Sequence, residues 1–99
     1  MNYSFHPEAE KELLEAICYY NECQDKLGIE FAKETYKSIQ NILLFPKAWT
    51  PLSSNTRRYL INRFPYGIIY QITEKEIYII AIMQLSRKPN YWENRERYK

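Results

Sequence analysis

The sequence predicts an α+β domain in which an N-terminal strand and an antiparallel helical hairpin pack on an antiparallel sheet, in the order β-α-α-β-β-β with a short C-terminal helical tail. Apolar residues recur at helical spacing in the first half of the chain and alternate at strand spacing from Arg57 onward. With 99 residues, 45% of them hydrophobic and 26% charged, the chain is expected to form one domain over residues 1–99.

Residues 2–5 are expected to form the short first strand. Pro7 suits the first position of a helix, with His6 as an N-terminal cap or a solvated residue, and acidic residues in the first turn favour the same start. The helix is expected to run to about Asp25. Gly28 then offers a left-handed residue that would end it.

A second amphipathic helix follows, with apolar positions from Phe31 to Leu43 and a limit at Pro46. Because the connection between the two helices is short, they are expected to form an antiparallel hairpin. Residues 47–56 contain proline, serine and asparagine and are predicted to form a loop.

Three strands are predicted in the second half. The first starts at Arg57 and ends in a turn at Phe64–Gly67, and the second covers residues 68–73. The third, residues 77–83, is apolar at nearly every position, which is typical of a central strand covered on both faces. Residues 91–99 are expected to form a short polar helix.

Arginines and aromatic residues are concentrated in this second half. The arginines are Arg57, Arg58, Arg63, Arg87, Arg95 and Arg97, and the aromatic residues among them include Tyr66, Tyr91 and Trp92. Guanidinium groups among aromatic rings suit a polyanion or an acidic protein partner. Since the net charge is only +2, such binding would depend on the local placement of these side chains.

Alternation along the strand puts Arg63 on the same face as Arg57, and Arg87 follows a nearby strand. Arg63 and Arg87 would then be able to clamp a phosphate, with Tyr91 as a proton donor. The alternative is that these arginines pair with acidic side chains of the helices or of a partner. Arg95 and Arg97 are assigned to the tail or to solvent, and Trp92 is expected to hold the tail on the sheet.

Other chemistry finds little support in the sequence. His6 is the only histidine, the glutamates on the helices are interpreted as a solvated face, and neither a nucleophile elbow nor a phosphate-binding loop is present. No metal or cofactor is expected. Cys18 and Cys23 are expected to be packing residues without a disulfide between them. Since no apolar run approaches a membrane span, the expected location is the cytoplasm.

Four segments in order resemble the RelE/ParE superfamily of toxins from type II toxin–antitoxin modules. They are FHPEAEKELLEAICYY, LGIEFAKETYKSI, RRYLINRFPYGIIYQI and IYIIAIMQLSRKPNYWENR. The resemblance covers nearly the whole chain. It implies a small cytoplasmic toxin that acts in plasmid stabilisation, bound in a hetero-oligomer by a cognate antitoxin whose disordered segment folds over it.

Two targets are open within this superfamily. ParE-like members bind and poison DNA gyrase, whereas RelE-like members cut messenger RNA on the ribosome without a metal. Superfamily members with this closing pattern often carry a histidine three residues before the arginine, where this chain has Gln84, and Lys47 alone represents the basic loop of the ribosome-bound nucleases. The ParE-like reading is therefore favoured, the ribonuclease is the alternative, and an inactive antitoxin-binding remnant is the third.

Candidate residues accompany each reading, the catalytic ones from the resemblance and the binding ones from the arginine and aromatic cluster. A ribonuclease would use Arg63, Arg87 and Tyr91 in catalysis. Binding of a partner or target would use Arg57, Arg58, Arg63, Tyr66, Arg87, Trp92 and Arg95.

Overall fold

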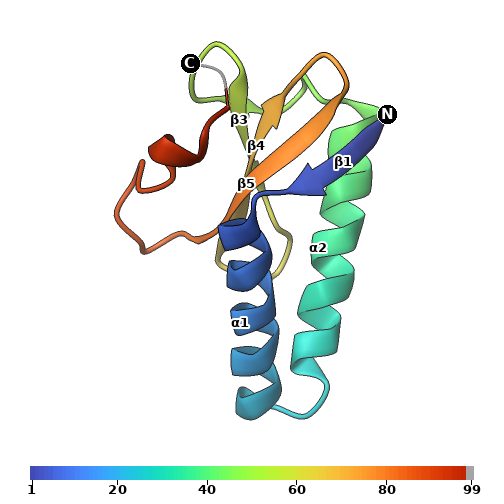
Figure 1. Ribbon diagram of the computed structural model, residues 1–99. Coiled ribbons are helices and arrows are strands. Elements are labelled where there is room, and N and C mark those ends of the chain that lie inside the picture. The colour runs from blue at the N-terminus through green and yellow to red at the C-terminus, as the bar shows by residue number, and fades with distance from the viewer. Residues whose placement is uncertain (98–99) are drawn as a thin grey trace.

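The computed structural model describes residues 1–97, and the last two residues of the expected C-terminal helix lie outside this range. The elements are β1 (Asn2–Phe5), α1 (Pro7–Cys23), α2 (Leu27–Leu44), β2 (Thr50–Pro51), β3 (Thr56–Leu60), β4 (Tyr66–Ile72), β5 (Glu76–Gln84) and the 3-10 turn η1 (Glu93–Arg95). The two helices run side by side as a hairpin below and beside the sheet (Figure 1). The predicted α+β class is confirmed.

The sheet has five strands in the order β1-β5-β4-β3-β2. It is mixed, because β1 pairs with β5 in parallel while the other neighbours are antiparallel. After β1, the helices α1 and α2 carry the chain to the opposite edge of the sheet, where β2 and β3 lie. The last strand, β5, therefore becomes the neighbour of β1 and runs parallel to it. The added strand β2 lies within the predicted loop 47–56, and the predicted central strand β5 is interior but second in the order.

The start of α1 is as predicted. His6 is the N-terminal cap, and its Nδ1 accepts a hydrogen bond of 3.0 Å from the Glu8 amide. Pro7 occupies the first turn, where the missing N–H costs nothing.

The prediction for Gly28 is wrong. The left-handed residue between the helices is Lys26, with φ 67°, and Gly28 lies inside α2. A glycine is favoured there by a close approach of the two helices: a Cβ on Gly28 would lie 2.2 Å from the Ile17 carbonyl oxygen. The Gly28 amide also donates to the Asn21 side chain at 2.8 Å.

One core lies between the helices and the sheet. Its fully buried side chains include Ala9 of α1, Phe31 and Ile42 of α2, and Ile68 and Ile79 of the sheet. Each helix therefore directs one apolar stripe toward the strands, which supplies most of its stability. No helix in the described part of the chain has both the length and the apolar run that crossing a bilayer requires.

A β-bulge in β5 changes which side chains face the helices. Ile80 is the extra residue, because its neighbours Ile79 and Ala81 pair with consecutive residues of β4. As a result Ile79 and Ile82 both pack in the helix-side core, while Ile80 and Ala81 both pack on the opposite face. The bulge therefore shifts the alternation of β5 by one residue within its buried stretch, residues 77–83.

The C-terminal tail covers the opposite face of the sheet. After β5 the chain turns and comes back on the side away from α2 (Figure 1). Trp92 is 4% exposed and packs with Ile69, Tyr78 and Met83. The predicted role of Trp92 in holding the tail on the sheet is confirmed, although the predicted tail helix is only the three-residue turn η1.

Candidate functional site

Glu12 of α1 contacts an unpaired stretch of the β5 edge. Strand β1 is short, and its ladder ends where the His6 amide donates to the Ile79 carbonyl at 2.8 Å. Beyond that point the Ile82 amide has no strand partner on this side and donates instead to Glu12 Oε1 at 3.0 Å. The carboxylate thus satisfies a backbone group that would otherwise be orphaned.

Arg95 completes the same edge from the tail. Its Nη1 donates to the Ile80 carbonyl at 3.0 Å and to Glu12 Oε1 at 3.0 Å. Its Nη2 donates to Glu12 Oε2 at 3.2 Å, so the guanidinium holds the carboxylate through both nitrogens. The side chains of Arg95 and Glu12 are 11% and 12% exposed, which makes this a largely buried ion pair.

Two further residues complete what we call the Glu12 cluster, which consists of Glu12, Arg87, Tyr91 and Arg95. Arg87 Nη1 lies 3.1 Å from Glu12 Oε2, and the Tyr91 hydroxyl donates to the same oxygen at 2.8 Å. The Arg87 guanidinium carbon is 3.8 Å from the centre of the Tyr91 ring, a cation–π distance. Arg87 remains 51% exposed, so it is the part of the cluster that an approaching molecule reaches first.

The chemistry of the cluster follows from its charges. Two guanidinium groups share one carboxylate, which leaves one positive charge at the surface. Burial, followed by the hydrogen bond to Glu12, raises the pKa of Tyr91 well above the usual tyrosine range. Tyr91 therefore stays protonated and donates to Glu12. Arg87, Tyr91 and Arg95 together are suited to bind an anion, and the Glu12 carboxylate of α1 is already that anion.

A groove of about 210 Å³ opens beside the cluster. Glu12, Ala16 and Tyr19 of α1 form one side, while Tyr66 and Arg87 contribute from the sheet and tail. Tyr66 is partly buried, and its ring packs near Phe31 and Tyr20, so the predicted binding residue also supports the core.

Arg63 does not occupy the predicted strand position. Strand β3 ends at Leu60, and Arg63 lies in the turn before β4 with φ 73°, so it cannot share a strand face with Arg57. Its guanidinium pairs with Glu30 of α2 at 2.8 Å. The predicted trio is thereby divided: Arg87 and Tyr91 meet at Glu12, and Arg63 binds a different carboxylate on the other helix.

The other arginines have varied surroundings. Arg57 donates to the carbonyls of Lys47 and Trp49 at 3.0 and 2.8 Å, which fixes the loop before β2. Arg97 was assigned to the tail or solvent, but its guanidinium pairs with Glu76 at 3.1 Å and lies 3.6 Å from the centre of the Tyr78 ring. The side chain of Arg58 makes neither a hydrogen bond nor an ion pair within residues 1–97.

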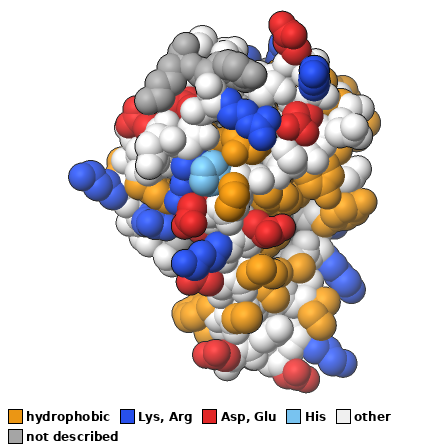
Figure 2. Space-filling model, viewed as in Figure 1, with side chains coloured by type: hydrophobic (Ala, Val, Ile, Leu, Met, Phe, Trp, Pro, Cys, Tyr) orange, Lys and Arg blue, Asp and Glu red, His pale blue; other side chains and the backbone are white. Residues whose placement is uncertain are grey.

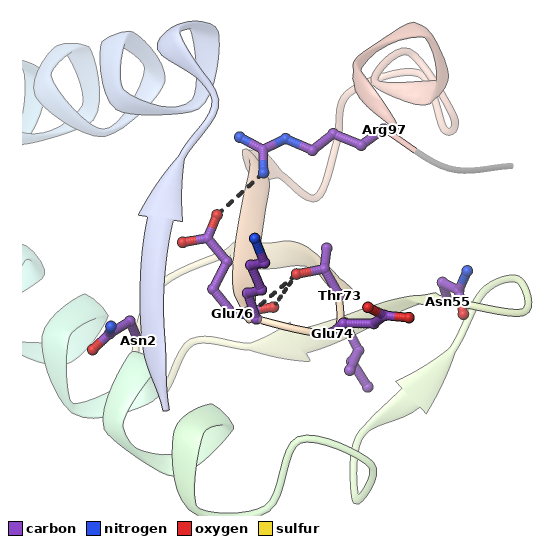
Figure 3. Close-up of a pocket in the computed structure, with 8 residues that line it drawn as sticks. Asn2, Asn55, Thr73, Glu74, Glu76 and Arg97 are labelled. Atoms are coloured by element: carbon purple, nitrogen blue, oxygen red, sulfur yellow. Dashed lines mark hydrogen bonds and ion pairs between the residues drawn. The ribbon is translucent and has the colours of Figure 1, made fainter.

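Figure 3 shows a larger pocket, of about 770 Å³, at the end of the β4–β5 hairpin. Arg97 reaches across it to Glu76, and Thr73 hydrogen-bonds the Glu76 backbone. Its lining mixes charges of both signs, and its only arginine is already paired. We therefore place the candidate site at the Glu12 cluster.

The residue that sequence reasoning missed is Glu12. It belongs to a helix whose glutamates were interpreted as a solvated face, and no local signal separates it from Glu8, Glu10 or Glu15. Its one distinction is that it follows Ala9 by three positions, on the edge of the apolar stripe. Arg95 was predicted for binding but not as a member of this cluster.

The cysteine prediction holds in part. Cys18 and Cys23 form no disulfide, but both are exposed, so they are not packing residues. Within residues 1–97, no three histidine, cysteine, aspartate or glutamate side chains are arranged to hold a metal ion.

Comparison with known families decides the family to which this fold and cluster belong. The sequence profile described as "ParE toxin of type II toxin-antitoxin system, parDE" matches residues 3–89, which is most of the chain. The chain belongs to the ParE toxin family. Membership in ParE implies a type II toxin–antitoxin module and a cognate antitoxin as partner.

A solved structure supports the ParE fold. The chromosomal ParDE toxin–antitoxin system from P. aeruginosa contains a chain that superposes with a TM-score of 0.74, at 13% sequence identity. The superposition covers 86% of this chain and 96% of that chain. At this identity the likeness concerns the fold alone. Comparison with individually curated proteins gives no match.

Proposed function

We propose that this ParE-family toxin acts in the cytoplasm by binding and inhibiting DNA gyrase, and that its antitoxin neutralises it by covering the toxin surface in a hetero-oligomer. The proposal rests on one observation: the Glu12 carboxylate already binds the Arg87, Tyr91 and Arg95 side chains that could otherwise bind a phosphate. Family membership supports the gyrase target, because ParE-like toxins are the gyrase-directed branch of the superfamily described above.

The Glu12 contacts favour binding over RNA cleavage. A nuclease would need Arg87 and Tyr91 to face a phosphate, yet both are held by the Glu12 carboxylate. A phosphate entering the site would have to displace Glu12, leaving that carboxylate beside another anion and the Ile82 amide without its acceptor. Burial and the hydrogen bond to Glu12 raise the pKa of Tyr91, which makes its hydroxyl a weaker acid and opposes the role of proton donor.

The exposed side of the cluster suits a contact with a large partner. Arg87 is half exposed and is followed by an exposed segment that runs to Asn90. Its guanidinium is oriented by both Glu12 and the Tyr91 ring, so little conformational freedom is lost when it binds. We propose that Arg87 and this segment contact gyrase.

The helical hairpin offers a second kind of surface. Leu14 and Tyr19 of α1 and Ile29 and Tyr36 of α2 are each at least 50% exposed. Figure 2 shows apolar side chains gathered over the hairpin. Exposed apolar residues of this size are typical of a protein interface, and we propose that the antitoxin covers part of them.

A supercoiling assay with purified gyrase tests the target. Arg87→Ala should raise the toxin concentration needed for half-inhibition by at least about tenfold, because an oriented interface cation is lost. Lys75→Ala, which removes an exposed cation at the opposite end of β5 from Arg87, should change it by less than about threefold. The proposal fails if wild-type toxin leaves supercoiling unchanged.

Induction in cells distinguishes the three readings. The gyrase reading predicts DNA damage with intact messenger RNA. New cleavage ends in translated messages that disappear in Arg87→Ala would instead establish the ribonuclease. Normal growth of induced cells, together with tight antitoxin binding, would establish the inactive remnant.

A further inference from the structure

Arg58 differs from every other arginine in the described chain. The partners of the others are backbone carbonyls for Arg57 and carboxylates for Arg63, Arg87, Arg95 and Arg97. Arg58 has no such partner within residues 1–97, and its Nε is buried without an acceptor. The buried Nε is closed to an outside acceptor, but the terminal guanidinium nitrogens are not among the buried atoms and have no partner within residues 1–97, so they are available to an acceptor from another molecule.

The stem of Arg58 is held in place by packing. Gly67 lies next to it on β4, and a Cβ on Gly67 would be 3.4 Å from the Arg58 Cγ and 3.5 Å from the Leu85 Cδ2. Gly67 is itself buried, so the Arg58 stem and Leu85 close over it. The apolar stem of Arg58 therefore packs against the sheet over Gly67, at distances that are ordinary van der Waals contact.

Apolar side chains flank this arginine. Leu60 is two residues further along β3, on the same face as Arg58 and opposite Gly67, and it is 54% exposed. Leu85 is 41% exposed. Within residues 1–97, an arginine side chain without a partner therefore lies beside two exposed leucines.

We propose that Arg58, Leu60 and Leu85 form a docking site for a carboxylate flanked by apolar side chains on the antitoxin. The proposal rests on the antitoxin as the partner in the proposed function and adds the place and chemistry of one contact. A nucleic acid is a poorer match. Its repeating phosphates require several cations, whereas the other arginines are already paired and the flanks of Arg58 are leucines.

The test measures antitoxin affinity by calorimetry, using the full-length toxin and its cognate antitoxin. Arg58→Met keeps the apolar stem and removes the charge. It should weaken binding by about ten- to a hundredfold and reduce the dependence of affinity on salt. Arg97→Met, which removes an arginine paired with Glu76, should weaken binding by less than about threefold.

Folding is checked separately by thermal melting. Arg58→Met should melt no lower than the wild type, because the buried Nε without an acceptor is removed. Unchanged antitoxin affinity in Arg58→Met overturns the inference, and it does so even if gyrase inhibition is lost, since that result would assign Arg58 to the target. If the wild-type toxin did not bind the antitoxin, the proposed partner would be rejected as well. A change of affinity in Arg58→Met alone cannot give that result, so the two failures are distinguishable.

Discussion

Glu12 accepts five hydrogen bonds, from the Ile82 amide, Arg87, Tyr91 and both terminal nitrogens of Arg95. One carboxylate therefore joins α1, the edge of β5 and the tail. A buried ion pair contributes little compared with an apolar replacement of both partners, but removing one partner leaves the other charge uncompensated. Glu12 therefore contributes to the fold mainly by joining α1, the edge of β5 and the tail.

Glu12→Gln should lower the free energy of unfolding by roughly 3 kcal/mol, because Arg95 would keep its charge at 11% exposure without a matching anion. Urea denaturation measures the change. Glu15→Gln on the exposed side of α1 should stay within about 0.5 kcal/mol of the wild type.

A double-mutant cycle sharpens the result. Adding Arg95→Met to Glu12→Gln should cost less than the sum of the two single changes, because the stranded charge is removed. Strict additivity would contradict the pairing of these two side chains.

Capping of α1 by His6 adds a pH dependence at the scale of the element. Burial, followed by repulsion from Arg95, lowers the pKa of His6, and protonated Nδ1 cannot accept from the Glu8 amide. A lowered pKa in the folded state means that the cap stabilises the protein above the unfolded pKa of about 6.5, and that this stability is lost as pH falls through the folded value.

The wild type should therefore lose stability as pH falls below about 6.5, by an amount up to that of a helix cap, about 1 kcal/mol. His6→Asn keeps an acceptor that does not titrate, so its stability should change less over the same range. The measurement is the urea midpoint from pH 7.5 to pH 5. Parallel curves for the two proteins would show that His6 does not carry the effect.

At the scale of the whole molecule, the tail turns a one-sided sheet into a sheet covered on both faces. Polar contacts fasten its end: Glu96 accepts from Thr56, and the Arg97 amide donates to the Gln71 side chain at 2.9 Å. Trp92 fills the space between these contacts and the Glu12 cluster. Because the tail contacts both β4 and β5, its loss should weaken the whole domain.

Trp92→Ala should destabilise the protein by about 3–5 kcal/mol, the range for removing a buried aromatic side chain. Glu93→Ala, at the next and exposed position, should change stability by less than about 0.5 kcal/mol. Denaturation followed by circular dichroism compares the two. A loss below about 1 kcal/mol for Trp92→Ala would mean that the tail contributes little to the fold.

Local patterns predicted the helices, the strands β3 to β5 and the cap at His6, because each depends on neighbours within a few residues. Gly28 shows where that reasoning stops. Glycine after an amphipathic helix usually marks its end, yet here the residue is selected by contact with the Ile17 carbonyl across the hairpin. Arg63 shows the same limit, since alternation was extended past the true end of β3.

The sequence by itself determined the order of the elements other than β2, the two amphipathic helices, the buried strand β5 and the RelE/ParE superfamily, because periodicity and segment order are written along the chain. Only the tertiary structure decided the partner of each charge. The Glu12 contacts join residues 70 to 83 positions apart, and the bulge at Ile80 sets which groups of β5 face them. Charges attract through space whatever their separation along the chain, so only the fold shows which arginine side chains have partners and that Arg58 has none within residues 1–97.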